Sequence, residues 1–211
     1  MYRKKFRYGL ILFLFVFQLF TVFSLNNHNL TENYNSEPPN KIEDEYINIS
    51  PKINAYSNPL HITGNNWTSA ASQWWCSGTG TESDPYIIED LEIDGQDLHS
   101  GIVIENSTAY FVIKNVSISN IGSLDSESAG IKLINTSNGI IQNSSFSSNY
   151  EGNYGIFLTN NSNSQIIKNN TLSFLKYGIY ILYDCLGTKI QNNFIYNMSY
   201  AGIYSYSDSS H

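Results

Sequence analysis

The sequence predicts an all-β solenoid, in which short parallel strands stack from one coil to the next. A Gly-Ile pair recurs at residues 101, 130, 155, 178 and 202, with intervals of 29, 25, 23 and 24 residues. A second motif, Ile-x-Asn-x-x followed by an apolar residue, begins about 12 residues after each of the first four pairs. Because the units show period-2 apolar patterns and no helical period, each coil is expected to consist of short strands joined by turns.

The repeated aliphatic residues define the expected interior. Side chains one and three positions after each Gly lie on the same side of a strand, so they point inward together. No single unit can bury that side alone, whereas stacked units bury it against their neighbours. The predicted interior columns are Ile102, Ile131, Ile156, Ile179 and Ile203, and Ile113, Ile141, Ile167 and Ile190.

The pattern favours a right-handed, single-stranded parallel β-helix of about five coils of 22–29 residues. A leucine-rich horseshoe has a similar period, but it needs a fixed Leu ladder, and here Ile and Asn occupy the repeated positions.

A ladder of Asn and Asp is predicted at one turn of each coil. Asn tolerates the left-handed backbone of a tight turn. Its amide can also donate to one neighbouring coil and accept from the other, which satisfies a partly buried polar group. The predicted ladder residues are Asp90, Asn115, Asn143, Asn169 and Asn192.

The N-terminal segment has the features of an export signal. Residues 1–9 are basic, and an almost continuously apolar run follows from Leu10 to Phe23. We interpret residues 1–24 as a signal peptide, or as an uncleaved N-terminal anchor, that engages the export machinery or the membrane. Either reading predicts an extracellular or cell-surface location.

Three further regions follow the export signal. Residues 25–60 are rich in Asn, Ser, Glu and Pro without a sustained period, which predicts a disordered polar linker. Residues 61–84 are expected to form an N-terminal cap with a short helix beginning near Trp67. The β-helix is expected over residues 85–211, and it is expected to be incomplete because the chain stops about ten residues into a coil.

Charge and composition argue against several functional classes. Four of the 11 Lys and Arg residues lie in the first seven positions, so the chain from residue 25 onward has a net charge of −11. Nucleic-acid binding needs clustered cations, so this charge disfavours such a partner. Two cysteines are too few for a disulfide-dense scaffold, and Cys76 and Cys185 are predicted to lie about four rungs apart, too far to pair.

A further motif precedes the repeats. Residues 77–86, Ser-Gly-Thr-Gly-Thr-Glu-Ser-Asp-Pro-Tyr, lead into Ile87-Ile88 and Ile93-Asp94-Gly95. With the Gly-Ile and Ile-x-Asn pattern, residues 77–211 resemble the right-handed β-helix repeat family, and more narrowly its pectin-lyase-like, carbohydrate-associated surface proteins. The resemblance is specific for fold and unspecific for activity. It implies that catalytic members gather carboxylates and a basic residue on an outer face.

Candidate site residues lie at positions expected to point outward. Glu105 and Lys132 lie one coil apart, which fits a surface ion pair better than the two carboxylates that glycoside hydrolysis needs. No catalytic residue is therefore assigned, and a non-enzymatic role is favoured. An aromatic strip on the same face either binds glycan or only stabilises the sheet, and it consists of Phe157, Tyr180, Tyr204 and Tyr206.

No cofactor or metal site is assigned from the sequence. Acidic residues near the first coil are either solvated charges or the ligands of a Ca²⁺ ion: Asp84, Glu92, Asp94 and Asp97. Because an amide locked in the ladder cannot carry a glycan, Asn115, Asn143 and Asn169 are predicted to stay unmodified despite their Asn-x-Ser/Thr motifs. The better N-glycosylation sites are predicted to be Asn66, Asn106, Asn135, Asn160 and Asn197.

These observations predict an exported protein, secreted or held at the cell surface, with a structural or glycan-interacting role. Its predicted partner is a polysaccharide or a cell-surface glycan. The alternative is the N-terminal part of a polysaccharide lyase, glycoside hydrolase or epimerase whose catalytic coils lie beyond residue 211.

Overall fold

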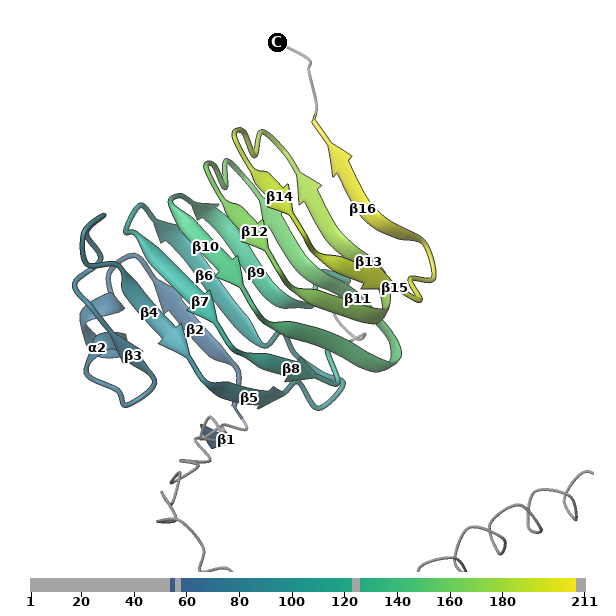
Figure 1. The fold of residues 1–211 in the computed structure, drawn as a ribbon, viewed down its shortest axis with the longest axis horizontal. Coiled ribbons are helices and arrows are strands. Elements are labelled where there is room, and N and C mark those ends of the chain that lie inside the picture. The colour runs from purple at the N-terminus through teal and green to yellow at the C-terminus, as the bar shows by residue number, and fades with distance from the viewer. Residues whose placement is uncertain (1–53, 56–57, 123–125, 208–211) are drawn as a thin grey trace, which may run out of the picture. The chain divides into compact units, whose positions relative to one another are not determined.

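Stacked parallel strands make up nearly all of the regular structure. The computed structural model describes residues 54–55, 58–122 and 126–207, which belong to one compact unit spanning residues 48–211. The predicted export signal and most of the predicted linker lie outside the described residues. Successive strands stack as the coils of a solenoid (Figure 1), which confirms the fold class predicted from the repeat.

Each full coil contributes a strand to each of three faces. Face one contains β4 (Tyr86–Glu89), β7 (Phe111–Lys114), β10 (Gly139–Gln142), β12 (Ile166–Lys168) and β14 (Lys189–Gln191). Face two contains β1 (Asn54–Ala55), β5 (Leu91–Asp94), β8 (Ser117–Ser119), the first residues of β11 (Ser145–Thr159) and of β13 (Thr171–Leu182), and β15 (Phe194–Tyr196). Face three contains β2 (Leu60–Thr63), β6 (Ile102–Ser107), β9 (Ala129–Thr136), the last residues of β11 and β13, and β16 (Ala201–Tyr206).

The pairing register confirms both predicted interior columns. On face three, each member of the first column pairs with its copy in the next coil, from Ile102 through Ile131, Ile156 and Ile179 to Ile203. The second column lies on face one, where the paired residues are Ile88, Ile113, Ile141, Ile167 and Ile190. The columns are fully buried through the middle coils, so the solenoid interior is a continuous stack of Ile.

The packing explains why Gly precedes the first four Ile residues of the first column. A Cβ atom at Gly155 would lie 2.4 Å from Leu172 Cδ2 and 2.7 Å from the Gly178 carbonyl oxygen. Real Cβ atoms do not approach a backbone carbonyl of a neighbouring coil so closely. Gly at this corner therefore lets adjacent coils stack at sheet spacing, which is about 4.8 Å.

The N-terminal end is closed by a short helix, α2 (Trp67–Ala71). Trp67 is 3% exposed, its ring stacks on Tyr86 with a centroid distance of 4.5 Å, and its Nε1 donates to Ser107 Oγ at 2.8 Å. The adjoining β3 (Cys76–Ser77) pairs with β4 in the antiparallel direction. This Trp is therefore part of the interior that closes the first coil.

The sheets begin earlier than the boundary expected at residue 85. Strand β1 pairs with β5, and β2 pairs with β6, both in the parallel direction. Leu60 and Ile62 are buried and extend the interior of face three, so Leu60–Thr63 is a strand of the solenoid. At the other end, Ile203 is 50% exposed although it occupies an interior column, because no described strand packs on β16 beyond β13.

Candidate functional site

The outer surface of face three carries the residues that strand parity predicted. One outward row runs from coil to coil and consists of His61, Val103, Lys132, Phe157, Tyr180 and Tyr204. A second row lies two residues further along each strand and consists of Thr63, Glu105, Ile134, Thr159, Leu182 and Tyr206. Along the solenoid the face therefore changes from polar and charged residues to aromatic residues.

An aromatic cluster covers the later coils of this face. We define it as Tyr154, Phe157, Tyr177, Tyr180, Tyr200 and Tyr204. The rings of Tyr180 and Tyr204 are stacked with centroids 5.0 Å apart and planes 9° apart. The rings form two columns, one of Tyr154, Tyr177 and Tyr200 and one of Phe157, Tyr180 and Tyr204. Tyr177 connects them, since its ring centroid lies 4.8 Å from that of Tyr180 and 4.9 Å from that of Tyr200.

The aromatic strip predicted from the sequence and the aromatic cluster in the structure share Phe157, Tyr180 and Tyr204. Phe157 is 1% exposed, because the Tyr154 ring lies 4.9 Å away and Lys132 Nζ lies 5.6 Å from the Phe157 centroid. It supports the cluster from within and has no surface to offer a ligand. Tyr206 is 47% exposed, and no ring of the cluster contacts it among the described residues.

Three members of the cluster were missed by the sequence argument: Tyr154, Tyr177 and Tyr200. A signal was available, since Tyr154 and Tyr177 come directly before a Gly-Ile pair and Tyr200 comes two residues before one. Strict alternation along the strand predicts that the residue before Gly points inward. The corner geometry turns these side chains onto the outer surface, where Tyr200 is 68% exposed.

The tyrosine hydroxyls of the cluster make no hydrogen bond to other described residues. Burial, and then the neighbouring phenols Tyr180 and Tyr177, raise the pKa of Tyr154 to about 12. Burial is also the main cause that raises the pKa of Tyr177 and of Tyr180. These groups therefore stay protonated at neutral pH and can act as donors and acceptors to a ligand.

The shifted pKa of Tyr154 predicts a pH-dependent stability. Because unfolded tyrosine ionises near pH 10, the folded chain holds this proton more tightly between pH 10 and about 12. The stabilisation is complete below pH 10, and the free energy of unfolding is expected to fall as the pH rises towards 12. Urea unfolding is measured at one pH below 10 and at one pH between 10 and 12. The free energy of unfolding should fall less between these two pH values for Tyr154→Phe than for the parent protein. An equal fall in both proteins would contradict the assignment.

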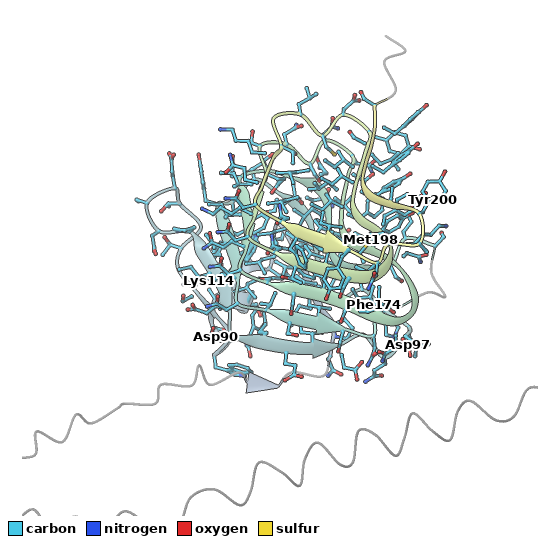
Figure 2. All side chains as sticks on the ribbon, turned by 45° about the vertical axis from the view of Figure 1, so that its right-hand side comes forward. Asp90, Asp97, Lys114, Phe174, Met198 and Tyr200 are labelled. Atoms are coloured by element: carbon cyan, nitrogen blue, oxygen red, sulfur yellow. The ribbon has the colours of Figure 1, made fainter. Side chains whose placement is uncertain are left out.

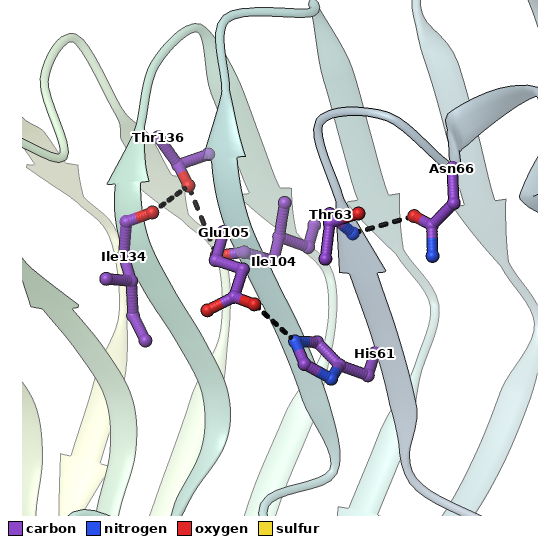
Figure 3. A network of polar contacts seen from close by, with 7 residues as sticks. All are labelled: His61, Thr63, Asn66, Ile104, Glu105, Ile134 and Thr136. Atoms are coloured by element: carbon purple, nitrogen blue, oxygen red, sulfur yellow. Dashed lines mark hydrogen bonds and ion pairs between the residues drawn. The ribbon is translucent and has the colours of Figure 1, made fainter.

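The first coils of the same face hold a polar pair, His61 and Glu105 (Figure 3), and an open groove lies beside it. His61 Nε2 lies 2.9 Å from Glu105 Oε1, and the side chains are 59% and 28% exposed. The groove measures about 350 Å³ and is lined by residues that include His61, His99, Leu98 and Val103. The strands of this outer surface carry one described carboxylate, Glu105, and glycoside hydrolysis needs two.

The expected contact between Glu105 and Lys132 is not formed. Glu105 pairs with His61, while Lys132 Nζ pairs with Glu127 Oε2 at 2.7 Å. The Lys132 side chain is 12% exposed, so its charge is largely covered. The reason is that the corner before β9 brings Glu127 closer to the ammonium group than the neighbouring strand does.

The other two outer surfaces differ in chemistry. Face one carries an apolar row, Ile87, Val112, Ile140 and Ile166, beside a row with the ion pair Lys114–Glu89 at 2.8 Å. The middle coils of face two carry short hydroxyl side chains: Ser117, Ser119, Ser145, Ser147, Thr171 and Ser173. The same rows hold Glu92 and Asp94 in the first coil and Phe194 and Tyr196 in the last. Figure 2 shows Lys114 and Tyr200 on opposite sides of the view. The aromatic cluster lies on face three, and a separate, smaller group of rings, Phe174, Phe194 and Tyr196, lies at the last coils of face two.

The predicted Asn/Asp ladder residues line up, with positive φ values between 51° and 57°. The left-handed turn therefore explains Asp90, Asn115, Asn143, Asn169 and Asn192. The structure corrects the bonding: the four Asn side chains are exposed, and one bond joins two ladder side chains in the described region, from Asn115 Nδ2 to Asp90 Oδ1 at 3.3 Å.

The buried polar ladder lies one residue further along the chain. Asn170 is 1% exposed, its Nδ2 donates to the Ile141 carbonyl at 3.0 Å, and its Oδ1 accepts from the Ser144 amide at 3.0 Å. Asn193 repeats this arrangement, since its Nδ2 donates to the Ile167 carbonyl and its Oδ1 accepts from the Asn170 amide. The sequence signal was a second polar residue directly after Asn143, Asn169 and Asn192, whereas Asn115 is followed by the apolar Val116.

Exposure does not separate the two groups of predicted N-glycosylation motifs. The preferred sites Asn66, Asn106, Asn135, Asn160 and Asn197 are all exposed, as are the ladder sites. Asn135 Nδ2 donates to Asn106 Oδ1 at 3.0 Å, so one preferred site has its amide bonded. Among the ladder sites, Asn115 Nδ2 is bonded to Asp90 Oδ1, so a bonded amide occurs in both groups and does not distinguish them.

The candidate Ca²⁺ ligands are not grouped around a common point in the structure. No three His, Cys, Asp or Glu side chains are grouped for a metal ion within the described part of the chain. Asp84 Oδ2 accepts from Thr79 Oγ1 at 2.8 Å, and Asp94 Oδ1 accepts from Asn120 Nδ2 at 3.0 Å. Asp84 therefore stabilises the turn on which it lies, and Asp94 links two neighbouring coils.

The two cysteines are both free. Burial raises the pKa of the Cys76 thiol to about 11, and burial is also the main cause that raises the pKa of Cys185. Both are thus weak nucleophiles at neutral pH.

Comparison with known proteins places the chain in one family. Residues 52–211 match the family described as right handed beta helix region. No curated protein matches the chain significantly, and no solved structure does. Where the structure describes the chain, no helix has the length and hydropathy of a membrane span. The stacked parallel coils and the family match over most of the sequence show that this protein belongs to the right-handed β-helix family.

Proposed function

We propose that this protein is an exported β-helix, secreted or held at the cell surface, that binds glycan on the outer surface of face three. The basic residues 1–9 and the apolar run after them support export. The aromatic cluster supports the binding role, and the observation that carries it is the set of tyrosine hydroxyls that have no hydrogen-bond partner among the described residues.

The ring arrangement decides how such a site would work. Tyr180 and Tyr204 stack on each other, so their facing surfaces are occupied and their edges and hydroxyls line the outside. Tyr200 is 68% exposed and offers more of its ring. A glycan can therefore contact ring edges and exchange hydrogen bonds with phenols, while apolar sugar faces cover exposed ring surface.

Removal of the phenols tests the proposal. In Tyr180→Ala/Tyr204→Ala, we expect affinity for a bound glycan to fall by about tenfold or more, because aromatic anchors dominate such contacts. Binding is measured first on a glycan array and then by titration calorimetry. Gln142→Ala, on the outer side of face one, is the matched control and should leave the affinity unchanged.

A second variant separates binding from folding. Tyr180→Phe/Tyr204→Phe keeps both rings and removes only the hydroxyls, so the fold should be retained and glycan affinity should still fall. A parent protein that binds no glycan, or a double Phe variant and a double Ala variant that both bind normally, would overturn the proposed role.

A further inference from the structure

The aromatic cluster repeats along the solenoid axis. Its two columns of rings advance one coil at a time, and centroid distances between coils are 5.4 and 4.9 Å in the column of Tyr154, Tyr177 and Tyr200. In the second column, Tyr180 lies 5.5 Å from Phe157 and 5.0 Å from Tyr204. These distances follow the strand spacing, which is about 4.8 Å. A linear ligand laid along the axis therefore meets a similar group at every coil.

The charge around the cluster is poorly suited to an acidic ligand. Lys132 is already paired with Glu127 and is largely covered. Lys176, whose Nζ lies 5.8 Å from the Tyr177 centroid, is the other described cation that contacts a cluster ring. The two Arg residues of the chain are Arg3 and Arg7, far from these coils in sequence. Recognition of carboxylate or sulfate groups relies on Arg forks or clustered Lys, and the described residues of this surface provide neither.

The charge of the whole chain acts in the same direction. From residue 25 onward the net charge is −11, so a polyanion would be repelled as it approaches. An uncharged ligand experiences no such repulsion. Protonated phenols suit such a ligand, since they both donate to and accept from sugar hydroxyls.

We propose that the aromatic cluster binds an extended, neutral polysaccharide that lies along the solenoid axis, with about one sugar residue per coil. The proposal rests on the proposed function and specifies its ligand. Successive sugars meet successive tyrosines, so the site ends where the cluster ends. Affinity should rise with oligosaccharide length across the coils of the cluster and then level off.

The experiment uses the full chain with two series of oligosaccharides of increasing length, one of neutral hexoses and one of uronic acids. Affinities are measured by calorimetry at low and at high salt. We expect the neutral series to bind with little salt dependence, because screening acts on charge pairs. Tyr200→Ala should lower the affinity of the longer neutral oligosaccharides about tenfold and change that of the shortest ones much less.

Lys176→Gln is the matched control, since it removes the accessible cation beside the cluster. It should leave neutral binding unchanged. Preferred binding of uronic acids, weakened by salt and by Lys176→Gln, would overturn the neutral ligand and leave the glycan-binding role standing. Neutral binding without length dependence would overturn the axial arrangement. Failure of both series, together with failure on the glycan array, would overturn the proposed function itself.

Discussion

Ile156→Ala is expected to destabilise the protein by about 2–5 kcal/mol. Ile156 is fully buried, and it pairs with Ile131 in one neighbouring coil and with Ile179 in the other. Truncation removes apolar contact with both coils and leaves a cavity that the flanking backbone cannot close, because strand pairing holds the coils at fixed spacing.

The same substitution in the last coil provides the control. Ile203 occupies the same column, but it is 50% exposed and pairs with Ile179 on one side. Ile203→Ala should therefore cost less than about 1 kcal/mol, since little buried area is lost. Urea unfolding followed by circular dichroism gives both values. Equal losses at the two positions would contradict a column whose energy comes from contact with both neighbouring coils.

Asn170→Ala is expected to lower the free energy of unfolding by about 2–6 kcal/mol. The side chain is 1% exposed and bonds the Ile141 carbonyl and the Ser144 amide. Alanine leaves both backbone groups buried without a partner, and each such group costs about 1–3 kcal/mol. Urea unfolding of the variant measures the loss.

The preceding residue gives a sharp contrast. Asn169 is exposed and has a φ of 56°, which Gly adopts without strain. Asn169→Gly should therefore change the free energy of unfolding by less than about 1 kcal/mol. If Asn169→Gly proved as damaging as Asn170→Ala, the hydrogen-bonded ladder would have to be assigned to the exposed residue.

The interior register could be predicted because it rests on local repetition. Each Gly-Ile pair fixes one inward position, and parallel in-register stacking of the repeated strands leaves a single consistent alignment. The structure pairs Ile102 with Ile131, and every later member of the column follows. The start of the sheets was harder to place, because Leu60–Thr63 carries no Gly-Ile pair and joins face three only through its Leu-x-Ile alternation.

The candidate site could be predicted only in outline. Alternation placed Phe157, Tyr180 and Tyr204 outward, and their pairing agrees with that direction. Alternation says nothing about what covers an outward residue. Phe157 is buried because Tyr154 and Lys132 fold over it from a corner and from the next strand.

The sequence by itself determined the solenoid and its interior columns, because periodic apolar spacing and turn-forming Asn are local properties that every coil repeats. Only the tertiary structure decided which polar ladder is buried, which carboxylate pairs with Lys132 and which tyrosines meet on face three. The physical reason is that burial and contact outside the strands depend on the corners, where coils differ in length and direction. A one-residue step there moves a side chain such as Asn170 inward while Asn169 stays in solvent.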